Sequence, residues 1–195
     1  MKRTALPRGS SVGLVRGALA ALAGALLTTA GGAGGTALAT PAPSPPDTTT
    51  RTIIFVRHAE KNPHPVGGDA GLNTRGLVRA QTLAHVLADA GIQIVYTSQF
   101  GRNRQTAEPI AKAIGDSARV YDANDLPGLA DRLRATPPGG TVLVVGHTDT
   151  IPQTIEELIG RRPPEGEPVD YDRMYVLMLN ADGTYRLLHL QYGAP

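Results

Sequence analysis

The chain has no cysteine and few aromatic residues. Without cysteine it can form no disulfide, carry no lipid on a cysteine, and offer neither a thiolate metal ligand nor a thiol nucleophile. Aromatic side chains make up only 4% of the 195 residues, and no basic stripe is interleaved with them. The composition therefore excludes thiol chemistry and gives no reason to expect a nucleic-acid partner.

Acidic residues are missing from residues 1–39, which hold four basic residues and an apolar run from Gly17 to Ala30. This pattern is typical of a secretory signal peptide, and Ala37-Leu38-Ala39 fits the small-x-small cleavage site. The run is shorter than the roughly 20 residues that a membrane-spanning helix needs. We therefore expect a cleaved signal over residues 1–39, a secreted or other extracytoplasmic location, and no stable membrane insertion after cleavage.

Removing the signal changes the charge balance. The whole chain has a formal net charge of +2, but the part after residue 39 keeps 15 Lys and Arg against 17 Asp and Glu, a net charge of −2. Residues 40–51 are rich in Pro and Thr without apolar periodicity, which predicts a flexible linker. The remaining residues, 52–195, are enough for one domain with its own core.

Apolar strand patterns alternate with helical patterns in residues 52–195. Strands are predicted at 52–56, 92–96, 119–121 and 141–145, and helices at 74–90, 102–114, 126–134 and 151–159, with Asn73 as the first N-cap. Two further strands, 173–180 and 184–191, flank the turn-forming Asp182-Gly183. This alternation predicts an α/β fold, a three-layer α/β/α sandwich with a mostly parallel sheet that the terminal hairpin makes mixed.

Three of the predicted strands end in polar clusters. These are Arg57-His58, the segment from Ser98 to Arg102, and His147-Thr148-Asp149. If the strands are parallel neighbours, the clusters converge on one edge of the sheet, where open α/β sheets bind their ligands. One crevice would then hold two arginines and two histidines.

Such a crevice suits a phosphomonoester. The planar guanidinium of arginine donates paired hydrogen bonds to phosphate oxygens and stays charged at every relevant pH. A neutral histidine can attack phosphorus through one ring nitrogen and so divide one difficult displacement into two easier ones. A second histidine, charged by the field of the phosphate, would help to neutralise the transition state.

Four segments, in order, resemble motifs of the histidine phosphatase superfamily, the phosphoglycerate mutase-like group. They are RHAEK at 57–61, DAGLNTRG at 69–76, SQFGRNRQTAEPIA at 98–111 and VVGHTDTIP at 144–152. They are similar to that family's Arg-His-Gly/Ala-Glu signature, its Asp-x-x-Leu-Thr-x-x-Gly helix opening, its Ser-x-x-x-Arg-x-x-Gln-Thr-Ala segment and its Gly-His-Ser/Thr-x-Thr segment. The resemblance covers residues 52–192 and indicates a small exported member.

The resemblance implies that His58 is the phosphorylated nucleophile. The rest of the phosphate pocket would be formed by Arg57, Arg102 and His147. It also implies that no metal and no organic cofactor take part. Ser98 and Thr148 could donate hydrogen bonds to the phosphate or could simply cap turns, and the sequence leaves both readings open.

The leaving group needs a proton, so an acid should lie beside the pocket. Asp149 is the first candidate, because it follows the second histidine by two positions. Asp122 is the next and Asp125 a third, since both follow the third strand, where another branch of the family carries its acid. Glu60 could instead orient neighbouring groups or form a plain salt bridge.

The function expected is a phosphomonoester hydrolase that acts through a phosphohistidine on a phosphorylated small molecule or phosphopeptide. His58-Ala59-Glu60 also fits the His-x-Glu of zinc deaminases, but their Pro-Cys-x-x-Cys segment is impossible without cysteine. A phosphoglycerate mutase-type phosphotransferase usually carries a longer insertion than the segment between Arg102 and His147. A phosphate- or phosphopeptide-binding module without turnover is the non-enzymatic alternative.

Overall fold

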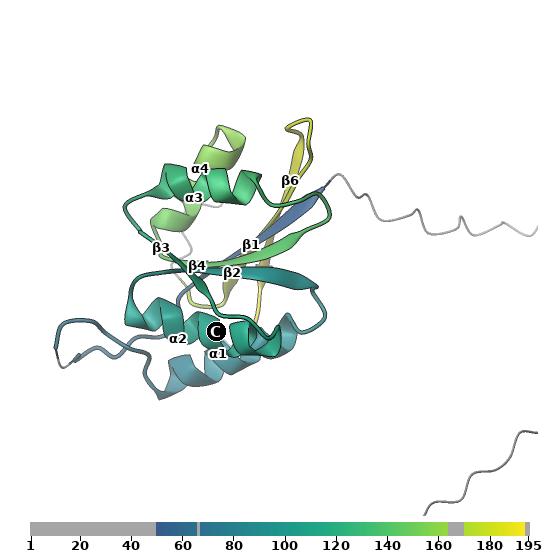
Figure 1. Cartoon of the computed structure of the whole chain (residues 1–195). Coiled ribbons are helices and arrows are strands. Elements are labelled where there is room, and N and C mark those ends of the chain that lie inside the picture. Colours follow the sequence, from purple (N-terminus) through teal and green to yellow (C-terminus); the bar gives the residue numbers. More distant parts are fainter. Residues whose placement is uncertain (1–49, 66, 164–169, 194–195) are drawn as a thin grey trace, which may run out of the picture. The chain divides into compact units, whose positions relative to one another are not determined.

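The computed structural model describes residues 50–65, 67–163 and 170–193, so the predicted signal peptide and residues 40–49 of the predicted linker lie outside the described residues. The described residues form one sheet and four helices (Figure 1). The strands are β1 (Arg51–Arg57), β2 (Ile92–Ser98), β3 (Arg119–Tyr121), β4 (Thr141–Gly146), β5 (Arg173–Leu179) and β6 (Tyr185–Gln191). The helices are α1 (Thr74–Val86), α2 (Gly101–Ala113), α3 (Leu126–Arg134) and α4 (Thr150–Ile159).

The sheet has the strand order β3-β2-β4-β1-β5-β6. Its first four strands in that order pair in parallel, whereas β5 pairs antiparallel with β1, and β6 pairs antiparallel with β5. The predicted α/β sandwich with a mixed sheet is therefore confirmed. The strands β2, β4 and β1, whose ends carry the predicted polar clusters, are direct neighbours.

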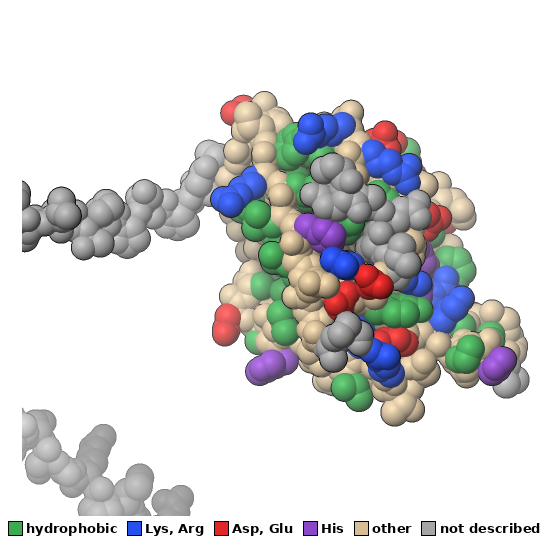
Figure 2. Space-filling view, turned by 180° about the vertical axis from the view of Figure 1, so that it is seen from behind, with side chains coloured by type: hydrophobic (Ala, Val, Ile, Leu, Met, Phe, Trp, Pro, Cys, Tyr) green, Lys and Arg blue, Asp and Glu red, His purple; other side chains and the backbone are tan. Residues whose placement is uncertain are grey.

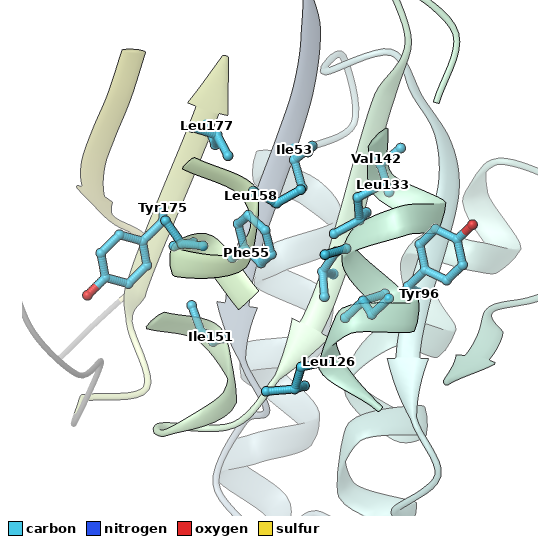
Figure 3. Close-up of a cluster of buried hydrophobic side chains, with 14 of the residues drawn as sticks. Ile53, Phe55, Tyr96, Leu126, Leu133, Val142, Ile151, Leu158, Tyr175 and Leu177 are labelled. Atoms are coloured by element: carbon cyan, nitrogen blue, oxygen red, sulfur yellow. The ribbon is translucent and has the colours of Figure 1, made fainter. Parts of the chain in front are cut away.

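Helices cover both faces of the sheet, and alternate strand residues point to each face (Figure 1). Ile53 and Phe55 of β1 face α3 and α4, where they join the larger core cluster (Figure 3). Ile54 and Val56 face α1 and α2. Because both faces are buried, the strand is a continuous run of bulky apolar residues rather than an alternating one.

Several predicted boundaries differ from the structure, most of them by one or two residues. Helix α1 ends at Val86 instead of residue 90, because Ala88 and Ala90 donate to carbonyls only three positions earlier and so tighten the chain into turns. The chain then reverses at Gly91, which has a positive φ of 64°. Strand β1 already begins at Arg51, the last residue of the predicted linker. The N-cap prediction for Asn73 is confirmed, since its side chain accepts from the amide of Gly76.

The surface carries mixed charges. On the face opposite the view of Figure 1, basic and acidic side chains lie interspersed (Figure 2). This agrees with the small net charge of the chain after residue 39. Within the described residues, no helix has the length and apolar character that crossing a bilayer requires.

Gly76 lets α1 pack directly on the turn that follows β1. A Cβ at this position would lie 2.3 Å from the carbonyl oxygen of Glu60, which is backbone and cannot rotate away. We expect Gly76→Ala to lower the free energy of unfolding by about 1–3 kcal/mol, the usual cost of overpacking, although alanine is otherwise the better helix former. Urea denaturation measures this, with Gln81→Ala on the exposed face of α1 as the control. An unchanged or increased stability of Gly76→Ala would contradict the close packing.

Candidate active site

The strand register brings the predicted site residues together. Arg57 at the end of β1 lies opposite Gly146 at the end of β4, and Thr97 of β2 lies opposite Val145 of β4. The residues that follow each strand therefore emerge side by side. The imidazole rings of His58 and His147 are 5.5 Å apart between centroids, in an edge-on arrangement.

The His58 ring is fixed in one tautomer. Its Nδ1 lies 2.8 Å from the backbone carbonyl oxygen of Ala59. Because a carbonyl oxygen only accepts, Nδ1 carries the proton, and Nε2 of the neutral ring keeps its lone pair. The neutral ring thus offers Nε2 as a nucleophile.

His58 is also held in the neutral form. It is 5% exposed, and this burial lowers its pKa to about 3, against the opposing effect of the hydrogen bond to Ala59. The positive charges of Arg102 and Arg57 lower the pKa further. The imidazole of His58 is therefore uncharged near neutral pH, as attack on phosphorus requires.

His147 is buried beside it and is oriented by Ser98. The Ser98 hydroxyl lies 2.9 Å from Nε2 of His147, and the His147 amide donates to the hydroxyl of Thr150. Burial and then the charge of Arg102 lower the pKa of His147 to about 4, while Asp149 acts in the opposite direction. The structure thus places Ser98 on the second histidine, and Thr148 half-buried in the turn between β4 and α4.

Each predicted pocket arginine lies against an aromatic ring. The guanidinium carbon of Arg57 lies 4.1 Å from the ring centroid of Tyr171, and that of Arg102 lies 4.6 Å from the centroid of Phe100. Nε of Arg102 is buried and has no hydrogen-bond partner within the described part of the chain. A buried donor of this kind is costly unless an acceptor binds to it, so the pocket suits an anion.

Two buried side chains of α2 hold the strand ends in place. The Asn103 amide donates to the carbonyls of Val145 and Gly146 at 3.2 and 2.9 Å. The Thr106 hydroxyl accepts from the Ala59 amide at 3.0 Å and donates to the carbonyl of Arg102 at 2.8 Å. Helix α2 therefore fixes both the turn that carries His58 and the end of β4.

Glu60 has a structural role at the edge of the site. Arg79 of α1 donates to both of its carboxylate oxygens at 2.8–3.0 Å, and Arg75 lies 3.1 Å away. Burial alone would raise the pKa of Glu60, but the hydrogen bonds from Arg79 hold it below its usual range. The carboxylate stays charged and ties the turn after β1 to α1, so of its two predicted roles the structure favours the ion pair.

The other three candidate acids differ in what they contact. Asp125 caps α3 by accepting from the Gly128 amide, and Asp122 accepts from the backbone and side-chain amides of Asn124. Asp149 is exposed, makes no cap hydrogen bond, and lines a pocket of about 280 Å³ together with residues that include Phe100, Arg102 and His147. Asp149 is thus the carboxylate that faces the predicted phosphate site.

Size alone would place the site elsewhere. Two larger hollows of about 450 Å³ each lie along α2, and neither is lined by a histidine. Among the residues placed by the structure, no group of three or more His, Cys, Asp or Glu side chains could hold a metal ion. We assign the site by its chemistry, because the 280 Å³ pocket, unlike these two hollows, is lined by the buried His147 and by Arg102.

Sequence reasoning missed the two aromatic rings. Phe100 lies between Ser98 and Arg102 within a motif already singled out, so its position gave a usable signal. Tyr171 precedes β5, far along the chain from any motif, and its ring lies 6.0 Å from that of His58. Only the sheet order, with β5 beside β1, brings Tyr171 to the pocket.

An α/β sheet with two arginines and a neutral histidine at its carboxyl edge has the architecture of a phosphoryl-transfer enzyme. Residues 53–130 match the family model of the histidine phosphatase superfamily, branch 1. These residues of the chain are thus similar in sequence to that superfamily. A search of curated proteins finds no significant match by sequence.

Solved structures whose names describe phosphatases share the fold. The protein histidine phosphatase SixA, solved with tungstate, is 21% identical, with a TM-score of 0.59 over 72% of this chain and 96% of the other. A candidate phosphohistidine phosphatase SixA from Nakamurella multipartitia is 25% identical, with a TM-score of 0.54 over 76% and 99%. The mycobacterial glucosyl-3-phosphoglycerate phosphatase is 16% identical, with a TM-score of 0.61 over 74% and 100%.

The lowered pKa values of both histidines predict how stability depends on pH. Each ring binds protons less readily when folded than when unfolded, where its pKa is about 6.5. The unfolded chain therefore takes up more protons below pH 6.5, and stability is lost as the pH falls from there towards the folded values of about 3 and about 4. Above pH 7 the two histidines should not affect the pH dependence of the free energy of unfolding.

We expect each histidine to add up to about 1.4 kcal/mol per pH unit to the loss of unfolding free energy below pH 6. Urea denaturation between pH 7.5 and 4.5 checks this against the double variant His58→Gln/His147→Gln, which should lose stability less steeply than the wild type. Parallel pH profiles of the two proteins would show that the histidines are not held neutral.

Proposed function

We propose that this protein hydrolyses phosphomonoesters through a covalent phosphohistidine at His58. One observation carries the proposal: a buried, neutral imidazole, with Nδ1 held by a carbonyl, lies beside Arg57 and Arg102. Positioning and charge stabilisation are the main demands of phosphoryl transfer, and these groups supply both. No resident metal is needed in this reaction, because the guanidinium groups neutralise the phosphate.

The reaction proceeds in two displacements. Nε2 of His58 attacks phosphorus, the bond from phosphorus to the ester oxygen breaks, and the leaving oxygen takes a proton from Asp149. Water then attacks the phosphorus, the bond from phosphorus to nitrogen breaks, and the Asp149 carboxylate takes a proton from the water. His58 recovers its lone pair, and Arg57 and Arg102 hold the phosphate oxygens in both steps.

His147 stabilises the negative charge of the transition state. It is neutral in the protein alone, and we expect a bound phosphate dianion to raise its pKa because an opposite charge favours the imidazolium. Phe100 packs edge-on against its ring at 5.3 Å between centroids and Ser98 holds Nε2. The ring is therefore preorganised before the phosphate binds.

Hydrolysis is favoured over transfer to a second substrate. Only residues 122–125 separate β3 from α3, and the candidate acid Asp149 is exposed. The segment between Arg102 and His147 thus holds the elements of the sandwich without an inserted cover, which supports hydrolysis. A phosphoglycerate mutase-type enzyme must instead keep water out while the phosphoryl group is retained.

For the substrate, we propose a phosphorylated small molecule or phosphopeptide. The names of the similar structures support this class: one is a protein histidine phosphatase and another acts on glucosyl-3-phosphoglycerate. A panel of phosphopeptides, sugar phosphates and nucleotides would separate these classes.

We also propose that the protein is exported by the signal in residues 1–39, which N-terminal sequencing of the mature protein would test.

His58 is expected to be indispensable. His58→Ala should abolish release of phosphate from p-nitrophenyl phosphate. A phosphohistidine, recognised because it is stable in base and labile in acid, should be trapped only in proteins that keep His58. Arg102→Ala should still form the intermediate but react on the order of 10²- to 10³-fold more slowly, like an enzyme that has lost one preorganised oxyanion donor.

The control for this experiment is His85→Ala, which removes an exposed histidine of α1 and should leave turnover unchanged. If wild type and His58→Ala both bind phosphate and both release it at the same negligible rate, the protein is a binding module instead. Full activity of Arg102→Ala would contradict the proposed pocket.

The role of Asp149 depends on the leaving group. Asp149→Asn should slow hydrolysis of alkyl phosphates on the order of 10²-fold, the usual contribution of a general acid, but hardly affect p-nitrophenyl phosphate, whose anion leaves without a proton. Initial rates on both substrates measure this, with Asp122→Asn as the matched control. A selective loss in Asp122→Asn instead would assign the acid to Asp122, and equal losses on both substrates would exclude Asp149.

A further inference from the structure

The first turn of α2 is capped by a residue from a distant loop. Phe100, its own N-cap residue, makes no side-chain cap hydrogen bond, and the first turn contains no acidic residue. Asp69 supplies the cap, because its Oδ2 accepts from the Gly101 amide at 2.7 Å. One of the amide donors left without a partner at the start of a helix is thereby satisfied.

The same carboxylate reaches the predicted phosphate arginine. Oδ1 of Asp69 lies 3.9 Å from Nη1 of Arg102, at the limit of an ion pair and beyond hydrogen-bond length. The carboxylate thus attracts the guanidinium without occupying one of its donors. On another side the guanidinium packs over Phe100 at 4.6 Å, while its buried Nε keeps no partner in the described range.

Asp69 is itself held in place by its loop. The loop closes where the Asn62 amide donates to the Gly71 carbonyl at 2.8 Å, and the Leu72 amide donates to the Gln105 side chain of α2 at 2.6 Å. The carboxylate also fits closely at Gly101, where a Cβ would lie 3.1 Å from Oδ2. Two contacts with α2, one made by Asp69 and one by Leu72, therefore hold this end of the loop in place.

We propose that Asp69 is a positioning residue of the phosphate site: it caps α2 and aims Arg102 at the phosphate oxygens. The proposal rests on the proposed function only in taking phosphate as the anion that Arg102 binds. Asp69 acts mainly through the hydrogen bond to Gly101, its charge at 3.9 Å from Arg102 adds a smaller part, and it contacts no reacting atom.

Phosphate affinity tests the proposal directly. Isothermal titration calorimetry with inorganic phosphate should show about 10-fold weaker binding for Asp69→Ala, which corresponds to a loss of about 1.4 kcal/mol of binding free energy. Asp69→Asn should stay within about threefold of the wild type, because its amide oxygen can still accept from Gly101. Rescue by the conservative variant would assign the effect to the hydrogen bond.

The matched control is Asp125→Ala. Asp125 caps α3 with the same kind of bond, accepting from the Gly128 amide at 3.0 Å. Its loss should lower the melting temperature about as much as Asp69→Ala does and leave phosphate affinity unchanged. Wild-type affinity in Asp69→Ala, or an equal loss of affinity in Asp125→Ala, would overturn the proposal.

A second measurement needs no bound phosphate. The Nε proton of Arg102 should give a slowly exchanging NMR signal in the wild type, identified by its disappearance in Arg102→Lys. The signal should persist in Asp69→Asn and exchange rapidly in Asp69→Ala. If the wild type binds no phosphate, the proposed function fails while this signal still decides the role of Asp69, and a protected signal in Asp69→Ala overturns it.

Discussion

The candidate site depends on one hydrogen bond, from Nδ1 of His58 to the backbone carbonyl of Ala59. Two constraints meet in this bond. It decides which ring nitrogen carries the proton, and so it leaves Nε2 free to attack. It is also made by a neighbouring residue of the same turn, so the orientation of the nucleophile depends on how firmly that turn is held.

The surrounding structure holds this turn from three directions. The His58 amide donates to the Gly146 carbonyl of β4 at 3.0 Å, Thr106 of α2 accepts from the Ala59 amide, and Arg79 of α1 pairs with Glu60. Three consecutive residues are thus tied to a strand and two helices on one side of the sheet. The opposite face, with α3 and α4, supplies the larger apolar cluster (Figure 3). One face therefore carries most of the positioning contacts and the other carries more of the core.

The sequence allowed the fold and the meeting of the polar clusters at one edge of the sheet to be predicted, because both follow from local patterns. Buried strands are apolar runs, and residues that follow adjacent parallel strands must meet at one edge, which located His58 and His147 without coordinates. The end of α1 was predicted four residues too late, since the apolar spacing continues through the turns after Val86. Tyr171 and the link from Asp69 to Gly101 could not be predicted, because they join segments whose contact depends on tertiary packing.

Electrostatics explains why both histidines must be neutral before the substrate arrives. The pocket already contains the charges of Arg57 and Arg102, and protonation of either ring would add a third positive charge in a partly desolvated space. In the proposed mechanism, a phosphate dianion reverses this balance. It pairs with the two guanidinium groups, and its remaining field favours a proton on His147, which does not attack, whereas Nε2 of His58 is consumed in the new bond to phosphorus. In the proposed mechanism, the two arginines that help burial to keep His58 uncharged in the empty site therefore also bind the phosphate in the occupied one.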